Sequence, residues 1–352
     1  MSGFMTLFSQ VLEQLRLAVV NVPGIAPLAD APFLFRPLVM VVLLGVVAGV
    51  IGVIINLRSA EFSAEAMVHA VFPGIVAGAV YWGINAIIPA ASVVAVAAAL
   101  VLTIVSHRSR RGEASEAGTA VVLTSFFSIG LILSLAKGDM SGQLEALMFG
   151  RLLEVTDERL AQALIVCAVA LLFIAATWKE QVAYAFDHTG ARASGLRLLA
   201  LDLVLNTAIA AAVVSASTAV GILLVIGYLV IPGATARVLA SRVRTMVLVA
   251  ITVGVGGGYL GMLLMALPET SDKPISPQAT VALVMTGILL IAVGVSTARE
   301  RLRGPARWAG SAQSTTAGVT STTVGAEAST DPIGGTEGSA RGVTPATERS
   351  RV

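Results

Sequence analysis

The chain has 352 residues, of which 56% are hydrophobic and only 12% are charged. Soluble domains carry about a quarter charged residues, so this composition excludes an ordinary soluble protein and predicts an all-α, polytopic membrane protein surrounded by lipid. The formal net charge of +2 is uninformative by itself, and we expect no nucleic-acid partner. The single cysteine, Cys167, excludes a disulfide framework and a thiolate metal cage.

Residues 1–36 are predicted to form an interfacial amphipathic helix followed by a connector. Within 3–20, apolar side chains recur at helical spacing, which is typical of a helix that lies on a membrane surface. These apolar positions are Phe4, Leu7, Phe8, Val11, Leu12 and Leu15. A proline-rich connector, 22–37, leads to the first span.

Residues 37–300 are predicted to form a transmembrane bundle. A spanning helix needs about 20 apolar residues. By this length the chain has about nine transmembrane helices, with eight as the alternative count. We expect them at 38–57, 66–84, 87–106, 117–136, 159–178, 198–216, 217–236, 245–266 and 278–298. The segment 143–153 is too short to span, and we expect a re-entrant or interfacial helix there.

Basic residues are divided unevenly between the loops on the two sides of these spans. The richer set holds Arg58, Arg108, Arg110, Arg111, Lys179, Arg192, Arg197, Arg237, Arg242, Arg244, Arg299, Arg301, Arg303 and Arg307. The poorer set holds Arg16, Arg36, Lys137, Arg151, Arg159 and Lys273. The positive-inside rule places the richer set in the cytoplasm. We therefore predict a multi-pass protein of the plasma membrane with its amino terminus outside and its carboxyl terminus in the cytoplasm.

The carboxyl-terminal segment, 301–352, changes character. It is rich in Ser, Thr, Gly, Ala and Pro and has almost no large apolar groups. Such a segment cannot bury a core, so a disordered cytoplasmic tail is predicted. A tether for a partner and a dispensable tail are both open interpretations.

One stretch at the start of the second span concentrates groups that lipid disfavours. Glu65 and His69 are four residues apart, so on a helix they share one face. Pro73, followed by Gly74, lacks the N–H that would bond the carbonyl of His69 and predicts a break in the helix. A carboxylate, an imidazole and a free carbonyl suit a divalent transition metal passing transiently. The alternative is an acidic helix start with a histidine bonded to a neighbouring helix.

A second irregular helix is expected around Pro232 and Gly233. Pro232 would free the carbonyl of Tyr228, and Gly233 favours a bend. This segment is either a broken helix that lines a cavity or a simple kink near the cytoplasmic end. In the preceding span, Asp202 and Asn206 also share a face, and we expect Asp202 to have a hydrated or hydrogen-bonded role near the cytoplasmic surface.

The chain has no phosphate-binding loop of its own. Such a loop places a lysine after a glycine, whereas Lys137, Lys179 and Lys273 all follow other residues. If transport is driven by ATP, another chain must hydrolyse it. The long loop 179–197, of mixed charge, is the expected surface for that partner.

Several of these stretches together resemble the membrane-spanning permease subunits of ABC-type manganese, zinc and iron importers. That family's pattern is roughly Gly-Asp-Ala-Leu-Ser-His-Ala-Val-Leu-Pro-Gly, and residues 64–74 here read AEAMVHAVFPG. Residues 220–237 resemble its Val-Gly-x-Leu-Leu-Val…Pro-Ala-Ala-Thr-Ala segment, and 116–121 resemble the acidic start of its fourth span. The likeness covers about residues 33–298. Glu65, Ala64 and Val68 replace the family's aspartate, glycine and serine.

The resemblance implies a set of partners and sites. It implies a permease homodimer, two cytoplasmic ATPase subunits that use the ATP, and an extracytoplasmic metal-binding lipoprotein. Glu65 and His69 match the positions thought to line the metal path, with no cofactor held permanently. The likeness to the family's cytoplasmic docking segment implies ATPase contacts at Phe186, Asp187, Ala191, Ala193 and Gly195.

The predicted function is therefore that of a non-enzymatic permease subunit. It would move a divalent metal, Mn or Zn and also Fe, across the membrane by alternating access. Three alternatives remain: a permease for a metal chelate such as a siderophore or cobalamin, an intramembrane hydrolase using Glu65 and His69, and a secondary transporter. The hydrolase would want a further motif within the spans, whereas His107 and His188 fall in loops.

Overall fold

The computed structural model describes residues 2–22, 24–108, 112–136, 150, 152–266 and 276–302. Over these ranges the regular structure is helical. Eight of the described helices are long and apolar enough to cross a membrane, and a shorter apolar helix, Leu224–Leu239, corresponds to the remaining predicted span. The fold class is therefore confirmed. The tail beyond residue 302 and almost all of 143–153 lie outside the described residues.

The helices follow the apolar segments of the sequence, because in lipid a helix satisfies every backbone hydrogen bond within itself. Their order is α1 Ser2–Val19, α2 Ala26–Ala29, α3 Pro32–Leu57, α4 Glu61–Ala70, α5 Phe72–Ala77, a π-helical turn Gly78–Trp82, a 3-10 turn Ile84–Ala86, α6 Ile87–Arg108, α7 Gly112–Ala136, a 3-10 turn Leu152–Glu154, α9 Asp157–Ala176, α10 Trp178–Phe186, α11 His188–Ala193, α12 Leu198–Val220, α13 Ile222–Leu239, α14 Val243–Ala266 and α15 Pro277–Leu302.

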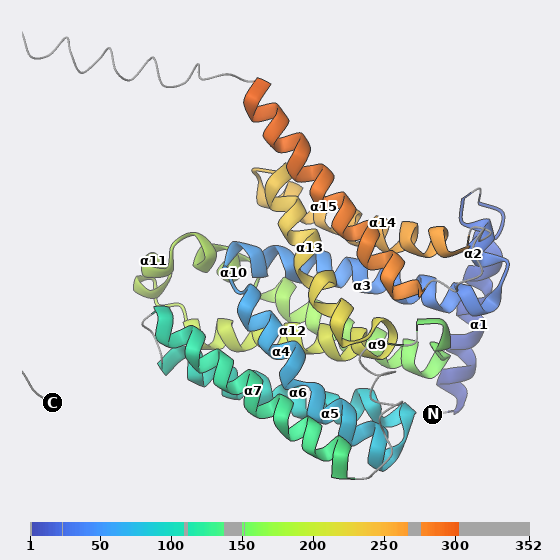
Figure 1. The fold of residues 1–352 in the computed structure, drawn as a ribbon, viewed down its shortest axis with the longest axis horizontal. Helices are drawn as coiled ribbons and strands as arrows, with labels where there is room; N and C mark the ends of the chain where they lie inside the picture. The colour runs from blue at the N-terminus through green and yellow to red at the C-terminus, as the bar shows by residue number, and fades with distance from the viewer. Residues whose placement is uncertain are drawn as a thin grey trace, which may run out of the picture. The chain divides into compact units, whose positions relative to one another are not determined.

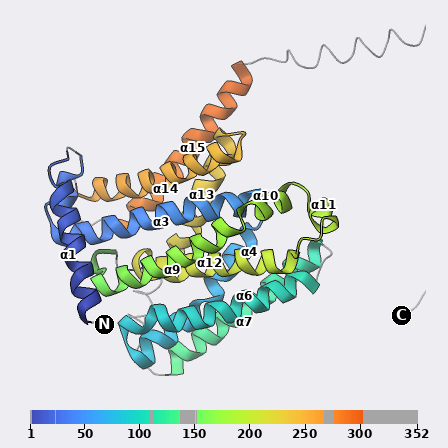
Figure 2. The ribbon, with the colours of Figure 1, turned by 180° about the vertical axis from the view of Figure 1, so that it is seen from behind.

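Two groups of helices flank α12 and α4 in the bundle (Figures 1 and 2). In one group, α3 packs against both α13 and α14; in the other, α5 packs against α6 and α7. Helix α12 contacts α6, α9 and α3, while α4 contacts α7, α12 and α13. Helix α4 therefore lies between the two groups, where its side chains can respond to a movement of either.

Glycines allow the closest approach within the first group. A Cβ atom on Gly45 of α3 would lie 2.6 Å from the backbone nitrogen of Val255 in α14, and one on Gly254 would lie 2.7 Å from the carbonyl oxygen of Gly45. Small residues are the usual means by which membrane helices bring their backbones together. The glycine spacing in the sequence thus serves helix packing.

Helix α1 lies across the end of the bundle that is opposite α10 and α11, as both ribbon views show (Figures 1 and 2). Ser9 of α1 donates a hydrogen bond to a carboxylate oxygen of Asp157 at the start of α9 (2.7 Å), and Arg36 of α3 pairs with the same carboxylate. The apolar side chains Phe4 and Leu7 of α1 are exposed. This placement fits the predicted interfacial helix.

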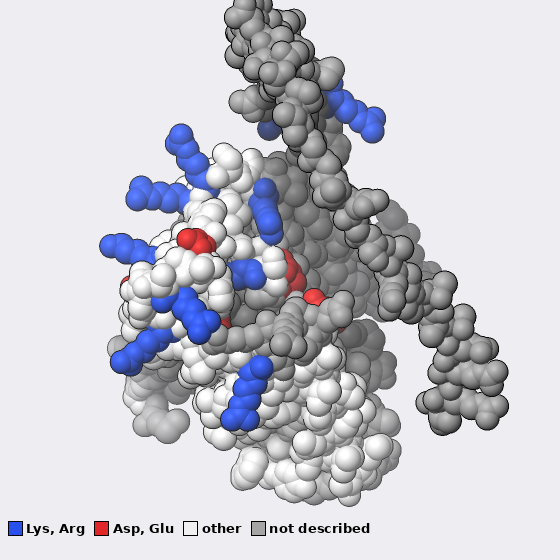
Figure 3. Space-filling model, turned by 90° about the vertical axis from the view of Figure 1, so that its left-hand side faces the viewer, with Lys and Arg blue, Asp and Glu red and all other residues white. Residues whose placement is uncertain are grey.

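Basic side chains gather at the end of the bundle that carries α10 and α11 (Figure 3). The described basic residues at the helix ends and connections there are Arg58, Arg108, Lys179, Arg192, Arg197, Arg237, Arg242, Arg244 and Arg299. The described ones at the α1 end are Arg16, Arg36 and Arg159. Folding therefore collects the positive charges of separate loops on one face.

Candidate metal path and the cytoplasmic end

The second span is interrupted close to the predicted position. Helix α4 ends at Ala70, Val71 forms a turn, and α5 begins at Phe72 with Pro73 in its first turn. Pro73 has no N–H to donate to the carbonyl of His69, and the N–H of Gly74 donates instead to the carbonyl of Val71 (3.0 Å). The helix therefore restarts one turn beyond His69.

Glu65 and His69 lie one helical turn apart on α4, and both side chains are partly buried. Among the described residues, the buried Nδ1 of His69 has no hydrogen-bond partner. The His69 ring packs edge-on against Phe127 of α7, with ring centroids 5.3 Å apart. Within the described residues, Nδ1 of His69 therefore does not form the hydrogen bond to a neighbouring helix that the alternative interpretation required.

The described residues do not complete a metal shell within one chain. They contain no group of three or more His, Cys, Asp or Glu side chains placed to hold an ion. A closed structural site needs about four ligands. What Glu65 and His69 can offer is a pair of donors, so an ion held here would take its other ligands from water, backbone carbonyls or another chain.

The predicted helix break at Pro232 and Gly233 is wrong, whereas the alternative of a simple kink stays a prediction. Helix α13 runs without interruption from Ile222 to Leu239, with Pro232 inside it. The chain instead turns at Gly221, whose φ of +78° separates α12 from α13 and moves the predicted boundary by several residues. Gly233 serves as a contact point, because a Cβ atom there would lie 2.3 Å from the carbonyl oxygen of Gly52 in α3.

The predicted docking loop folds into two short helices at the basic end of the bundle. Asp187 ends α10 and starts α11, where its carboxylate accepts a hydrogen bond from the N–H of Gly190 (2.8 Å). Phe186 is 70% exposed, whereas Ala191 is buried. Ala193 is the last residue of α11, and Gly195 follows with a φ of +82°. The five residues therefore share one short helical hairpin, with one large apolar side chain exposed.

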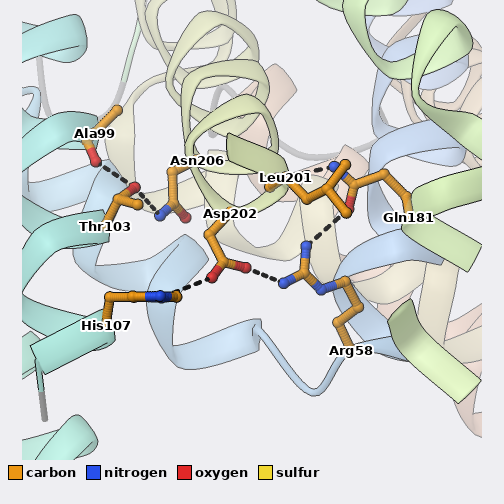
Figure 4. A network of polar contacts seen from close by, with 8 residues as sticks. All are labelled: Arg58, Ala99, Thr103, His107, Gln181, Leu201, Asp202 and Asn206. Carbon is orange, nitrogen blue, oxygen red and sulfur yellow. Dashed lines mark hydrogen bonds and ion pairs between the residues drawn. The ribbon is translucent and has the colours of Figure 1, made fainter. Parts of the chain in front are cut away.

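A polar network beside this hairpin was not foreseen from the sequence (Figure 4). Arg58, at the end of α3, forms an ion pair with Asp202 of α12 and donates to Oε1 of Gln181 in α10 (2.7 Å). The other carboxylate oxygen of Asp202 lies 3.6 Å from Nδ1 of His107 in α6. The sequence predicts a polar, near-surface position for Asp202 but not its partner. The one local sign of that partner is Arg58, an arginine shortly before the Glu65 segment.

A cavity of about 520 Å³ lies next to this network. Its lining includes Ser63 of α4, Tyr184 of α10 and His188 of α11. Burial raises the pKa of the Tyr184 hydroxyl, and the neighbouring Asp202 carboxylate adds to the effect. The cavity thus joins the first turn of α4 to the exposed hairpin through neutral and charged polar groups.

Comparisons with known proteins agree with this architecture. The family model described as the ABC 3 transport family matches residues 30–296. The chain is 35% identical over 231 residues, 65% of this chain and 80% of the relative, to the manganese transport system membrane protein MntC of Listeria monocytogenes. It is 31% identical over 238 residues, 67% of this chain and 84% of the relative, to the manganese import system permease protein ScaB of Streptococcus gordonii.

A further relative and a solved structure extend the comparison. The chain is 31% identical over 226 residues to the chelated iron transport system membrane protein YfeC of Yersinia pestis, which covers 63% of this chain and 75% of the relative. The structure of PsaBC from Streptococcus pneumoniae in complex with Fab matches with a TM-score of 0.65 and 26% identity, over 76% of this chain and 94% of that one. The chain belongs to the ABC 3 transport family.

Proposed function

We propose that this protein is the permease subunit of an ATP-binding-cassette importer that moves a divalent transition metal, manganese, zinc or iron, across the plasma membrane. The observation that carries the proposal is the pair of donors on α4. Glu65 and His69 are partly buried and share a helix face, and the buried Nδ1 of His69 has no hydrogen-bond partner among the described residues. Ionisable groups at membrane depth are costly and are retained where they serve a pathway.

We expect a second copy of the chain to complete the metal path. A carboxylate that is only partly buried cannot face acyl chains without a large solvation cost, so the exposed side of Glu65 must meet water or protein. The described residues of one chain also supply no third acidic, histidine or cysteine ligand. A permease homodimer with the two α4 helices facing a shared, hydrated path satisfies both conditions.

Energy for transport comes from partner ATPase subunits that dock at the basic end. The exposed Phe186 and the capped turn at Asp187 support α10 and α11 as the docking hairpin. The gathering of basic residues on this end supports a cytoplasmic location for it and an outer location for α1. An extracytoplasmic metal-binding protein delivers the ion to the α1 end, and alternating access exposes Glu65 and His69 to each side in turn.

The test is uptake of metal by cells or vesicles that contain the complete transporter. Glu65→Gln and His69→Ala are each expected to lower the initial rate of 54Mn or 65Zn uptake by about tenfold or more, in line with the effect of losing a group that supports a metal site. The amount of permease in the membrane should stay normal. Glu13→Gln, an exposed acid on α1, is the matched control and should transport as the wild type does.

The same assay separates bare ions from chelates. Uptake is measured for free Mn²⁺, Zn²⁺ and Fe²⁺ and for a ferric chelate at equal metal concentration. Preference for a free ion supports the proposal, whereas a preference for the chelate would assign the permease to the chelate class. Normal uptake by both variants would remove Glu65 and His69 from the path.

A further inference from the structure

Arg58 stands at the junction of three structural parts. It ends α3, and the next residue, Ser59, has a φ of +50°, an unusual value for a residue other than glycine. Helix α4, with Glu65 and His69, begins at Glu61 directly after this turn. Whatever holds the Arg58 side chain therefore also fixes the point at which α4 leaves α3.

The guanidinium of Arg58 is held from three sides. It pairs with Asp202 of α12, donates to Oε1 of Gln181 of α10 (2.7 Å) and lies 4.0 Å above the ring of Tyr184, also of α10. The Arg58 side chain is 10% exposed and that of Asp202 is 21% exposed. Water therefore screens the ion pair only weakly, and a planar, forked guanidinium is needed to make all three contacts at once.

The α10 side of this junction is equally well defined (Figure 4). Gln181 is completely buried, and its Nε2 donates to the carbonyl of Leu201 in α12 (2.9 Å). Its amide is thus used on both sides, by Arg58 and by the backbone of α12. A shift of α10 must either break these bonds or carry Arg58 with it, because a buried amide left without partners is costly.

We propose that Arg58 is a positioning residue, and this inference rests on the proposed function. Arg58 transmits the movement of the α10–α11 hairpin, which the ATPase drives, to helix α4 with its metal ligands. The Gln181 and Tyr184 contacts follow the hairpin, while the turn at Ser59 transfers the displacement of Arg58 to the start of α4. Asp202 keeps the guanidinium charge compensated throughout the movement. Arg58 does not touch the metal; it acts through the placement of Glu65 and His69.

The experiment measures whether the start of α4 responds to nucleotide. Ser63→Cys is introduced into the cavity wall, where it can be labelled; the native Cys167 is fully buried. The purified permease with its ATPase is reconstituted in liposomes, and the rate of maleimide labelling at position 63 is compared with and without a non-hydrolysable ATP analogue. ATPase activity and thermal unfolding are measured on the same samples.

In the otherwise wild-type protein, the nucleotide is expected to change the labelling rate. Arg58→Lys keeps the charge beside Asp202 but loses the fork to Gln181, so the nucleotide-dependent change should shrink by about fivefold or more, the lower range of coupling between distant sites. ATP hydrolysis should continue. Arg244→Lys, an exposed arginine at the start of α14, is the control and should respond fully.

A second variant covers the case in which Arg58→Lys does not fold. Gln181→Met leaves the Arg58–Asp202 pair and the contact of Arg58 with Tyr184 in place and removes the hydrogen bonds of the Gln181 amide to Arg58 and to Leu201. A nucleotide response smaller than that of the otherwise wild-type protein is therefore expected. A normal nucleotide-dependent change in labelling in either folded variant would contradict the role of Arg58 but not the proposed function. Failure of the Ser63→Cys protein itself to bind the ATPase or respond to nucleotide overturns the proposed function, and the role of Arg58 with it.

Discussion

Two short stretches of this chain are nearly identical, yet they fold differently. Residues 71–74 read VFPG and residues 230–233 read VIPG. At the first, the helix stops at Ala70 and restarts at Phe72; at the second, α13 continues through Pro232. Each proline removes one backbone hydrogen bond. The difference between them must therefore come from the helices packed around each.

The surroundings of the two prolines explain the outcome. At the break, the fully buried ring of Phe72 lies against α7, where a Cβ atom on Gly130 would be 2.5 Å from Phe72 Cδ1. At Pro232, the side-chain amide of Asn56 donates to the carbonyls of Gly52 (2.9 Å) and Val230 (3.3 Å), which joins α3 to the helix across the proline. Tertiary contacts thus decide whether a proline interrupts a membrane helix.

The largest expected effect comes from disturbing the contact between α13 and α3. In Gly233→Ala the added methyl group would lie 2.3 Å from the carbonyl oxygen of Gly52 and 2.5 Å from Nδ2 of Asn56. Because backbone atoms cannot move aside as a side chain can, stability should fall by about 1–3 kcal/mol, measured by thermal unfolding in detergent.

Gly227→Ala in the same helix is the matched control. Its nearest neighbour would be Ile231 Cδ1 at 3.5 Å, an ordinary contact. An alanine there should be neutral or slightly stabilising, because glycine is a poor helix former. Equal losses in the two variants would show that the close approach at Gly233 does not support α13.

A smaller effect is expected from removing the Asn56 amide. Asn56 is buried, and Asn56→Leu keeps a similar volume while deleting both bonds to α3 and α13. The loss should be about 1 kcal/mol, the usual net value of a hydrogen bond. Asn85→Leu, which deletes an exposed bond to Glu158, should change the unfolding temperature much less; a comparable drop would point to a general cost of losing surface amides.

The smallest effect on stability should come from replacing Pro73 or Pro232 with alanine. The two replacements should differ in their effect on metal uptake. Pro232→Ala should alter stability by less than about 0.5 kcal/mol and leave metal uptake unchanged, because the backbone hydrogen bond that it restores in the continuous helix offsets the packing lost with the buried ring. Pro73→Ala restores an N–H that can bond the His69 carbonyl, so it should straighten the junction of α4 and α5 and lower uptake. The proposed importance of the break is contradicted if both variants transport normally.

The sequence alone determined the membrane class, the order of the spans and the pairing of Glu65 with His69. These features are local: hydrophobic length decides a span because lipid leaves the backbone no other partner, and a spacing of four places two side chains on one helix face. The sequence also placed positive charges in alternate loops, which the fold then gathers at one end (Figure 3).

Only the tertiary structure decided which of the two prolines breaks its helix and which residues meet at the α10–α11 end. Gln181 lies 123 residues after Arg58 in the sequence, and Asp202 lies 144 residues after it. No local pattern therefore brings the three together. Asn56 and Val230 are 174 residues apart. Such contacts depend on how whole helices pack, and packing is set by many side chains at once, which is why one stretch of sequence cannot reveal it.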